Sequence, residues 1–479
     1  MKYLPFLLFL FLTIANAQDF KTEFEKSDGT RTATYHQTIN FYQNLARTYP
    51  EISIQEIGTT DSGKPLHLVI FNTDFNSDHK IISQSSKATI LINNGIHPGE
   101  PDGIDASMIL LRDIVQDDEL KNKFKDIIIC VIPVYNIGGS LNRNSTSRVN
   151  QNGPESYGFR GNARNFDLNR DFIKNDTKNA QTFAEIFHLV DPDIFIENHV
   201  SNGADYQYTL THLFTQHNKL GGELGEFLNN TMLPEIEKDL QGKDLYATPY
   251  VNVFNNVPDN GFSQFFDAPR YSTGYTTLFN TLGFMVETHM LKPYKQRVEA
   301  TYEMMLSSLN FLTNYGEQAK NLRNKANKRI IANSFYPIQW EIDSAKITTL
   351  QFRGYNGNYI KSEVTGLNRL KYDRSKPFTK PVEYYKHFKP RKEIEIPKAY
   401  IIPQGWWKVI KRLNLNKIDY QIFETDTLIS VESYKIEDFK TVKNTYEGHY
   451  LHYNTQVYKS TEEVNFRKGD LYIPTNQKG

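Results

Sequence analysis

The sequence predicts an α/β fold, with helices on both sides of a mainly parallel sheet and a smaller β-rich domain after it. Four apolar, β-branched-rich runs are continuous rather than alternating, which is typical of strands that are covered on both faces. Helical patterns separate these runs, and after about residue 330 short aromatic runs alternate with Gly, Pro, Asn and Lys. The four runs are Ala88–Asn93, Ile127–Val134, Ile194–Glu197 and Phe284–Glu287.

The chain begins with a segment that is typical of an export signal. Lys2 precedes the apolar run Leu4–Ile14, and Ala15-Asn16-Ala17 is a small-x-small cleavage site before Gln18. The run is shorter than the roughly 20 residues that a transmembrane helix needs. We therefore expect residues 1–17 to be a cleaved signal peptide, the protein to be secreted or periplasmic, and no transmembrane segment to remain after cleavage.

The elements around the four runs also have recognisable patterns. Residues 33–49 have apolar side chains at helical spacing. Two strand-like runs, Ile52–Ile57 and His67–Phe71, flank a Gly-containing turn and predict a β-hairpin. Further helices are expected at Asp105–Val115, Thr177–Leu189, Leu220–Leu240 and Met304–Lys328.

The chain is long enough for two domains, which we expect over residues 18–328 and 329–479. In the second, β-rich accessory domain, Tyr400–Pro403 and Leu471–Pro474 are strand-like, and a helix is expected near Trp406–Leu413, with Trp406 and Trp407 packed in a core. Because strand-like residues lie so close to the last residue, we also expect the chain to be a fragment of a longer protein. The sequence does not indicate the oligomeric state.

Charge and cysteine content exclude several classes of protein. Lys+Arg and Asp+Glu are both 55, so the formal net charge is zero and the sequence lacks the basic character of a nucleic-acid binder. The single cysteine, Cys130, lies in an apolar run and is expected to be a buried thiol rather than a nucleophile. An exported chain without an internal disulfide is not a cysteine-stapled fold and indicates a bacterial periplasm or surface.

Residues that can bind a metal follow two of the predicted strands. His97 and Glu100 come after the run Ala88–Asn93, and His199 comes after Ile194–Glu197. Two imidazoles and one carboxylate are a ligand set of catalytic zinc sites, in which the fourth position is left for water or substrate. Because open α/β sheets bind ligands at the carboxyl ends of their strands, these side chains are expected to meet. The sequence therefore predicts one zinc ion per chain and a hydrolase.

Glu287 ends the fourth apolar run and is expected at the same edge of the sheet. A carboxylate there is costly to bury without a role. Beside a metal-activated water it can take up a proton and return it to a leaving amine. We therefore expect Glu287 to be the general base, and we expect the nearby His289 to have a structural or supporting role.

An arginine- and asparagine-rich stretch offers groups for an anionic substrate. Asn169 and Arg170, within Arg164–Phe172, combine an amide with a guanidinium and can grip a carboxylate. Arg143 and Arg148 lie upstream, and one of them near the zinc could stabilise the oxyanion that forms when water adds to a carbonyl. On composition alone the same stretch is consistent with a solvated loop.

Four features occur in order along the chain: His-Pro-Gly-Glu, Asp-Leu-Asn-Arg, a later His after a strand, and a Glu near the end of the α/β domain. In this order they resemble the zinc carboxypeptidase family over about residues 35–320. The resemblance implies an α/β/α sandwich with an eight-stranded mixed sheet, one zinc ion, a water nucleophile, and cleavage at the C-termini of peptides or proteins. By position it implies that His97, Glu100 and His199 are the zinc ligands. It implies that Asn169 and Arg170 hold the terminal carboxylate and that Glu287 is the general base.

The resemblance also implies a carbonyl-polarising arginine, Arg148 with Arg143 as the alternative, and a tyrosine that closes over the substrate, Tyr271 with Tyr275 as the alternative. Digestive members of the family have Arg just before the Glu ligand, where this chain has Gly99, which removes one substrate contact. Two other functions stay open. One is a zinc amidohydrolase of the same fold acting on acylated amino acids or cell-wall peptides, and the other is an inactive binding protein. The preferred terminal residue is not predicted.

Overall fold

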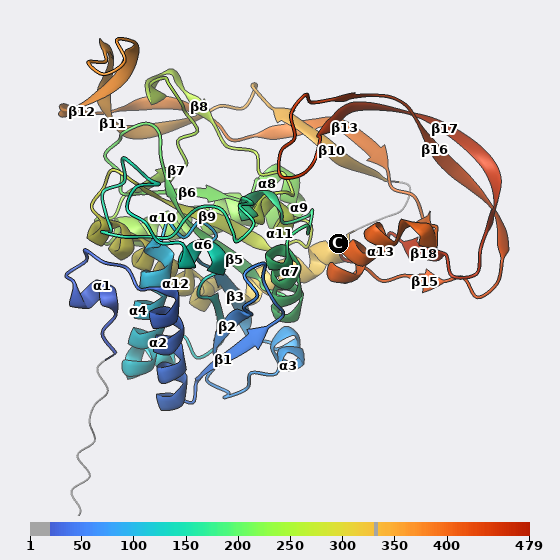
Figure 1. Cartoon of the computed structure of the whole chain (residues 1–479), viewed down its shortest axis with the longest axis horizontal. Coiled ribbons are helices and arrows are strands. Elements are labelled where there is room, and N and C mark those ends of the chain that lie inside the picture. The colour runs from blue at the N-terminus through green and yellow to red at the C-terminus, as the bar shows by residue number, and fades with distance from the viewer. Residues whose placement is uncertain (1–19, 330–333) are drawn as a thin grey trace, which may run out of the picture.

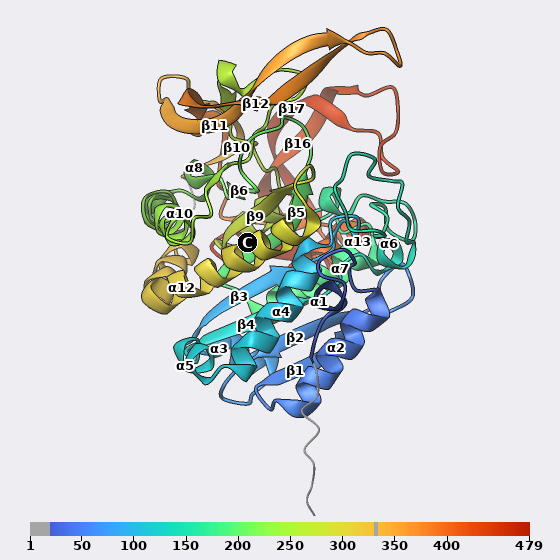
Figure 2. The same cartoon turned by 90° about the vertical axis from the view of Figure 1, so that its left-hand side faces the viewer.

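The computed structural model describes residues 20–329 and 334–479 (Figures 1 and 2). The predicted signal peptide, residues 1–17, lies outside this part of the chain. Of the helices that are described, none has both the length and the apolar character to cross a membrane.

An eight-stranded mixed sheet forms the centre of the fold, in the order β1-β2-β4-β3-β5-β9-β6-β7. The predicted sheet is confirmed: β4, β3, β5 and β9 are parallel neighbours, and the β1–β2 hairpin is antiparallel. The continuous apolar runs form the central strands of the sheet, since β3, β4 and β5 are buried along their whole length. Cys130 is a buried thiol inside β4. The strands are β1 (Ile52–Ile57), β2 (Leu66–Phe71), β3 (Ala88–Asn93), β4 (Ile127–Ile132), β5 (Ile194–Ser201), β6 (Leu210–Phe214), β7 (Ala247–Pro249) and β9 (Leu282–His289).

Helices cover both faces of this sheet, as predicted (Figure 1). On one face α4 packs against both α2 and α12, and on the other α7 and α11 pack on the strands. Sequence signals set their ends: Thr34 caps α2 reciprocally with Gln37, and Thr177 caps α7. The helices are α1 (Glu23–Lys26), α2 (Tyr35–Thr48), α3 (His79–Gln84), α4 (Asp102–Gln116), α5 (Asp118–Lys123), α6 (Ile137–Leu141), α7 (Lys178–Val190), α11 (Ser272–Thr277) and α12 (Tyr294–Asn327).

The predicted helix Leu220–Leu240 is confirmed over nearly all of its length, but it begins at Gly222. Gly221 and Gly222 have φ values of 67° and 55°, which are left-handed and separate the helix from the preceding turn α8 (His217–Leu220). The helical backbone then runs on from α9 (Gly222–Phe227) through a π-helical turn (Leu228–Met232) into α10 (Leu233–Gln241).

Two strands are longer than their apolar runs predict. β5 continues to Ser201 and β9 to His289, because the last residues of the two strands pair with each other. His199 therefore lies inside β5 rather than after it, and Glu287 lies inside β9 rather than at its end.

The C-terminal part of the chain is rich in β-structure, as predicted, and forms small sheets beside the large one. The helix expected near Trp406–Leu413 is present as α13 (Trp407–Leu415). The expectation that Trp406 and Trp407 are core residues is wrong: they are 63% and 61% exposed, because they lie on the outside where α13 begins. The strands are β8 (Phe262–Ser263), β10 (Phe335–Ile342), β11 (Thr348–Lys361), β12 (Asn368–Tyr385), β13 (Phe388–Glu395), β14 (Ala399–Ile402), β15 (Gln421–Ile422), β16 (Thr427–Thr441), β17 (His452–Phe466) and β18 (Leu471–Pro474).

A second hydrophobic core joins the β-rich part to the α/β part. It contains Tyr206, Tyr208 and Phe262 from before residue 330, and Phe352 and Tyr384 from after it. β8 also adds to β12 as a parallel strand. The two parts therefore share buried surface and backbone hydrogen bonds rather than only a linker.

Candidate metal centre and substrate pocket

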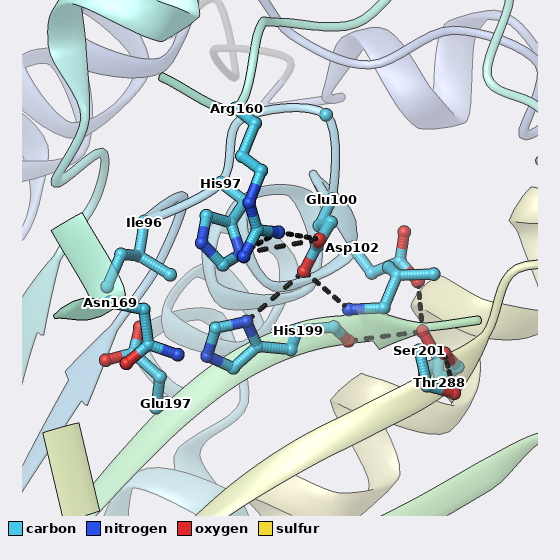
Figure 3. A network of polar contacts seen from close by, with 12 residues as sticks. Ile96, His97, Glu100, Asp102, Arg160, Asn169, Glu197, His199, Ser201 and Thr288 are labelled. Atoms are coloured by element: carbon cyan, nitrogen blue, oxygen red, sulfur yellow. Dashed lines mark hydrogen bonds and ion pairs between the residues drawn. The ribbon is translucent and has the colours of Figure 1, made fainter. Parts of the chain in front are cut away.

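His97, Glu100 and His199 come together at the carboxyl edge of the large sheet (Figure 3). His97 and Glu100 lie on the turn between β3 and α4, where the Glu100 amide donates to the His97 carbonyl. One potential ligand atom from each residue lies within 4.8 Å of the other two. Among the described residues, this is the group of His, Cys, Asp and Glu side chains that is close enough to hold a metal ion.

The carboxylate of Glu100 is buried but is held in its charged form. Burial alone would raise the pKa of Glu100, but the positive charge of Arg148 and the neighbouring imidazoles of His97 and His199 lower it well below its ordinary value. The Arg148 guanidinium lies 2.7 Å from Oε1, and the Val200 amide donates to Oε2 at 2.9 Å. Glu100 is therefore a charged carboxylate at the candidate metal centre.

The hydrogen bonds of His97 select its tautomer. Arg160 donates from Nη1 to Nδ1 of His97 at 3.2 Å, so Nδ1 carries the lone pair. Nε2 then carries the proton and donates to Asp167 Oδ1 at 3.0 Å. A carboxylate on the second nitrogen is the arrangement that orients metal-binding histidines.

The donor set fits zinc. Nδ1 of His97 lies 3.4 Å from Glu100 Oε1, and Nδ1 of His199 lies 3.2 Å from Glu100 Oε2, so each of the two imidazoles turns this nitrogen toward the carboxylate. Two imidazole nitrogens and one carboxylate form a site with three protein ligands and an open fourth position. The two histidines differ behind the site, because Nε2 of His199 is buried without a hydrogen-bond partner in the described part of the chain.

Glu287 faces the same space from the neighbouring strand. It is the register partner of His199, and it lines a cavity of about 520 Å³ together with the three candidate metal ligands. Enclosure by the protein and the charge of Glu100 raise the pKa of Glu287 well above its ordinary value, while Arg148 acts in the opposite direction. A carboxyl with a raised pKa inside a cavity is suited to accept and donate a proton.

The two candidate arginines have different surroundings. Arg148 lines the cavity, contacts Glu100 and donates to the Val200 carbonyl at 2.9 Å. Arg143 is absent from the described lining of the cavity, and it donates instead to the Ser156 carbonyl at 2.6 Å. The structure therefore brings Arg148, and not Arg143, to the candidate metal centre.

The candidate carboxylate-binding pair also lines the cavity. Asn169 and Arg170 belong to a short 3-10 turn, and the Arg170 guanidinium lies 4.6 Å from the centre of the Tyr271 ring. Tyr271 is a lining residue too. Tyr275 is fully buried, and its hydroxyl contacts His188 and donates to Asn416, so it belongs to the core.

The register of the sheet explains the apolar side of the cavity. Met285 in β9 pairs with Leu213 in β6, and Glu287 pairs with Thr211. Met285 is therefore two residues from Glu287 along the same strand. Side chains two residues apart on a strand point to the same face. The polar groups and these apolar side chains therefore line one space. It is completed on this side by Tyr250, Phe254 and Phe265.

Some site residues were not predicted. Asp167 belongs to the Asp-Leu-Asn-Arg motif, but the sequence predicts no role for it, and Arg160 lies outside any predicted motif. His289, expected to be structural, accepts from the Leu291 amide and donates to the Ala204 carbonyl at 2.7 Å.

A family model described as zinc carboxypeptidase matches residues 38–197, which include His97, Glu100 and Asn169 and end before His199. Carboxypeptidase 2 of Trichophyton rubrum is 22% identical over 470 residues, which cover 94% of this chain and 81% of the relative. A carboxypeptidase 2 of Trichophyton tonsurans is likewise 22% identical over 483 residues, or 94% of this chain and 81% of the relative.

Solved structures of carboxypeptidases also match. The metallo-carboxypeptidase of Burkholderia cenocepacia has a TM-score of 0.43 at 15% identity, over 58% of this chain and 68% of that one. The carboxypeptidase A of Helicoverpa armigera has a TM-score of 0.44 at 14% identity, over 59% of this chain and 73% of that one.

Proposed function

We propose that the protein is a zinc-dependent metallocarboxypeptidase, since residues 38–197 of this chain belong to the zinc carboxypeptidase family. It hydrolyses the last peptide bond of peptide or protein substrates. The observation that supports this most is the meeting of two groups in one cavity: the ligand set His97, Glu100 and His199, and the pair Asn169 and Arg170.

Zinc held by these three ligands would supply a Lewis acid and a water of lowered pKa. Glu287 takes the proton of the attacking water on its carboxylate and delivers it to the nitrogen of the leaving amino acid. Its position opposite His199 in the sheet supports this role. Arg148 is the cation nearest to Glu100, and it stabilises the negative charge that develops on the carbonyl oxygen of the scissile bond.

Asn169 and Arg170 hold the free carboxylate at the end of the substrate. A guanidinium can bind a carboxylate through two parallel hydrogen bonds, and the neighbouring amide adds a further donor. Tyr271 lies against Arg170 and covers this end of the cavity. The terminal side chain then lies against Leu213, Met285 and Phe265.

Residues 1–17 support export of the protein, which would place the enzyme among extracellular or periplasmic peptides. We treat residues 18–328 as the catalytic domain and residues 329–479 as an accessory domain. The shared core described above supports a structural role for the latter.

The test is the release of amino acids from a substrate panel by the zinc-loaded protein. The panel contains peptides with free C-termini, the same peptides amidated, and N-acylated amino acids. The expected result is release of single residues from the free C-termini, only residual cleavage of the amidated peptides, and no hydrolysis of the acylated amino acids. Hydrolysis of acylated amino acids without peptide cleavage would favour the amidohydrolase alternative, and no hydrolysis at all would contradict the proposal.

A further inference from the structure

The hairpin of β16 and β17 reaches the candidate metal centre from the far end of the sequence. The two strands pair with each other and, among the described residues, with no other strand. In Figure 1 the ribbon leaves the region of α13 and β18 and arches back over the molecule. Its tip is a tight turn at Tyr446–His449, in which Glu447 and Gly448 have φ values of 51° and 78°.

The tip makes three contacts with the loops that carry site residues. The backbone amide of Asp167 donates to Glu447 Oε1 at 3.0 Å. His449 Nε2 lies 2.7 Å from Asp176 Oδ2. The Arg270 guanidinium, next to Tyr271 in the chain, lies 5.6 Å from the centre of the Tyr446 ring.

The first of these contacts continues directly to a metal-binding residue. Asp167 is fixed at its amide by Glu447 and at its carboxylate by His97 Nε2, at 3.0 Å, and by Arg160, at 2.7 Å. The chain of contacts from Glu447 to the His97 ring is therefore unbroken.

We propose that Glu447 is a positioning residue for the metal centre. It holds the Asp167 backbone so that the Asp167 carboxylate keeps the Nδ1 lone pair of His97 directed toward Glu100. The Asp167 amide needs an acceptor oxygen at this place, and the Glu447 side chain supplies one at 3.0 Å. Free-standing two-stranded hairpins are only marginally stable, so contacts at the tip also fix where this hairpin lies. This inference rests on the proposed zinc site, and it gives the β-rich part of the chain a share in metal binding.

The experiment measures the zinc dissociation constant of the full-length protein by competition with a chromophoric chelator at one pH. The variants are Glu447→Ala, Glu447→Gln and, as a matched control on the exposed face of the same hairpin, Glu437→Ala. Loss of a partner behind a metal ligand typically weakens metal binding 10- to 100-fold. Glu447 is one hydrogen bond further from the metal than such a partner. We therefore expect the zinc dissociation constant of Glu447→Ala to be about tenfold larger than that of the wild type. Glu447→Gln keeps the acceptor oxygen and is expected to remain within about twofold of wild type.

A wild-type dissociation constant in Glu447→Ala overturns the proposal, and so does an equal loss in Glu447→Gln, which would mean that charge rather than the acceptor matters. Equal loss in Glu437→Ala would reduce the effect to general destabilisation of the hairpin and would also overturn it. The failure of the proposed function is distinguishable, because a wild-type protein that binds zinc but releases no terminal residue contradicts only the activity. A wild-type protein that binds no zinc contradicts both.

Discussion

His199 and Glu287 are register partners on the adjacent parallel strands β5 and β9, so the sheet itself places the candidate base beside a candidate metal ligand. Loop movement is not needed to bring them together, since both are inside strands. The spacing between the proton acceptor and the metal centre is therefore a property of the core of the protein.

Replacing Glu287 by Gln should separate proton transfer from metal binding. The amide has nearly the same shape but cannot accept the proton, so kcat should fall by about 10²- to 10⁴-fold. Zinc content, measured by mass spectrometry on the same samples, should stay at the wild-type level because Glu287 is outside the ligand group. Turnover close to that of the wild type would show that another group is the base.

Replacing His199 by Ala should remove the metal. Two protein ligands bind zinc far more weakly than three, so we expect about one zinc per wild-type chain and much less than one in the variant. His36, which is exposed in α2, provides the control, because His36→Ala should retain full occupancy. Equal zinc content in all three proteins would mean that the ion is bound elsewhere.

Arg148→Ala and Arg143→Ala should have opposite profiles. Loss of Arg148 removes a cation from the cavity, and we expect kcat to fall by about 10²- to 10³-fold, as for other groups that stabilise an oxyanion. Loss of Arg143 removes hydrogen bonds to the carbonyls of Ser156, Thr32 and Ala33, so it should lower the melting temperature and leave kcat nearly unchanged. A fall in kcat in the Arg143 variant alone would mean that Arg143, and not Arg148, stabilises the oxyanion.

Arg170→Ala should weaken only substrates that have a free terminal carboxylate. We expect KM for a free peptide to rise at least tenfold, because a charge-assisted pair is lost. Residual cleavage of the amidated peptide should not change. Arg164, exposed on the same loop and stacked on Phe166, gives a control that also removes one positive charge. An equal loss for free and amidated peptides would contradict the carboxylate-binding role.

His289 should make the stability of the fold depend on pH. Burial lowers its pKa to about 4, and the Leu291 amide already donates to its Nδ1, so the folded state excludes the protonated ring. The unfolded chain takes up this proton near pH 6.5. The contribution of His289 is therefore present above about pH 6.5 and is lost as the pH falls toward 4.

The measurement compares urea unfolding of wild type and His289→Gln at pH 7.5 and pH 5. At pH 7.5 the variant should be less stable by about 1–3 kcal/mol, because two buried backbone groups lose their partner. The difference should shrink at pH 5. A difference that does not change with pH would mean that His289 titrates normally in the folded protein.

Much of the α/β part could be predicted because its signals are local. Continuous apolar runs identify β3, β4, β5 and β9, and the spacing of His97 and Glu100 on one turn suggests a shared ion. The start of the helix at Gly222 differs from the predicted Leu220, because the periodicity of apolar residues does not register the positive φ values of Gly221 and Gly222. The exposed Trp406 was misjudged for a related reason, since apolar composition does not say whether a partner surface exists.

The contacts of Glu447 could not have been predicted from local patterns. Its partner Asp167 lies 280 residues earlier in the chain. A hydrogen bond to a backbone amide leaves no requirement on the type of the partner residue, so nothing in the sequence near Asp167 signals the hairpin. Only the three-dimensional course of β16 and β17 brings the two together.

The pairing of β8 with β12 sets an order of events during synthesis. Phe262 leaves the ribosome first, but the strand that pairs with it, at Tyr384, follows about 120 residues later. Chains emerge at about 5–20 residues per second, so Phe352 and Tyr384, which complete the second hydrophobic core, are made several seconds after the last strand of the large sheet. Glu447 arrives later still. The contact of this hairpin with Asp167 is therefore added when nearly the whole chain has been made, and a nascent chain arrested before that point would carry the candidate ligands without it.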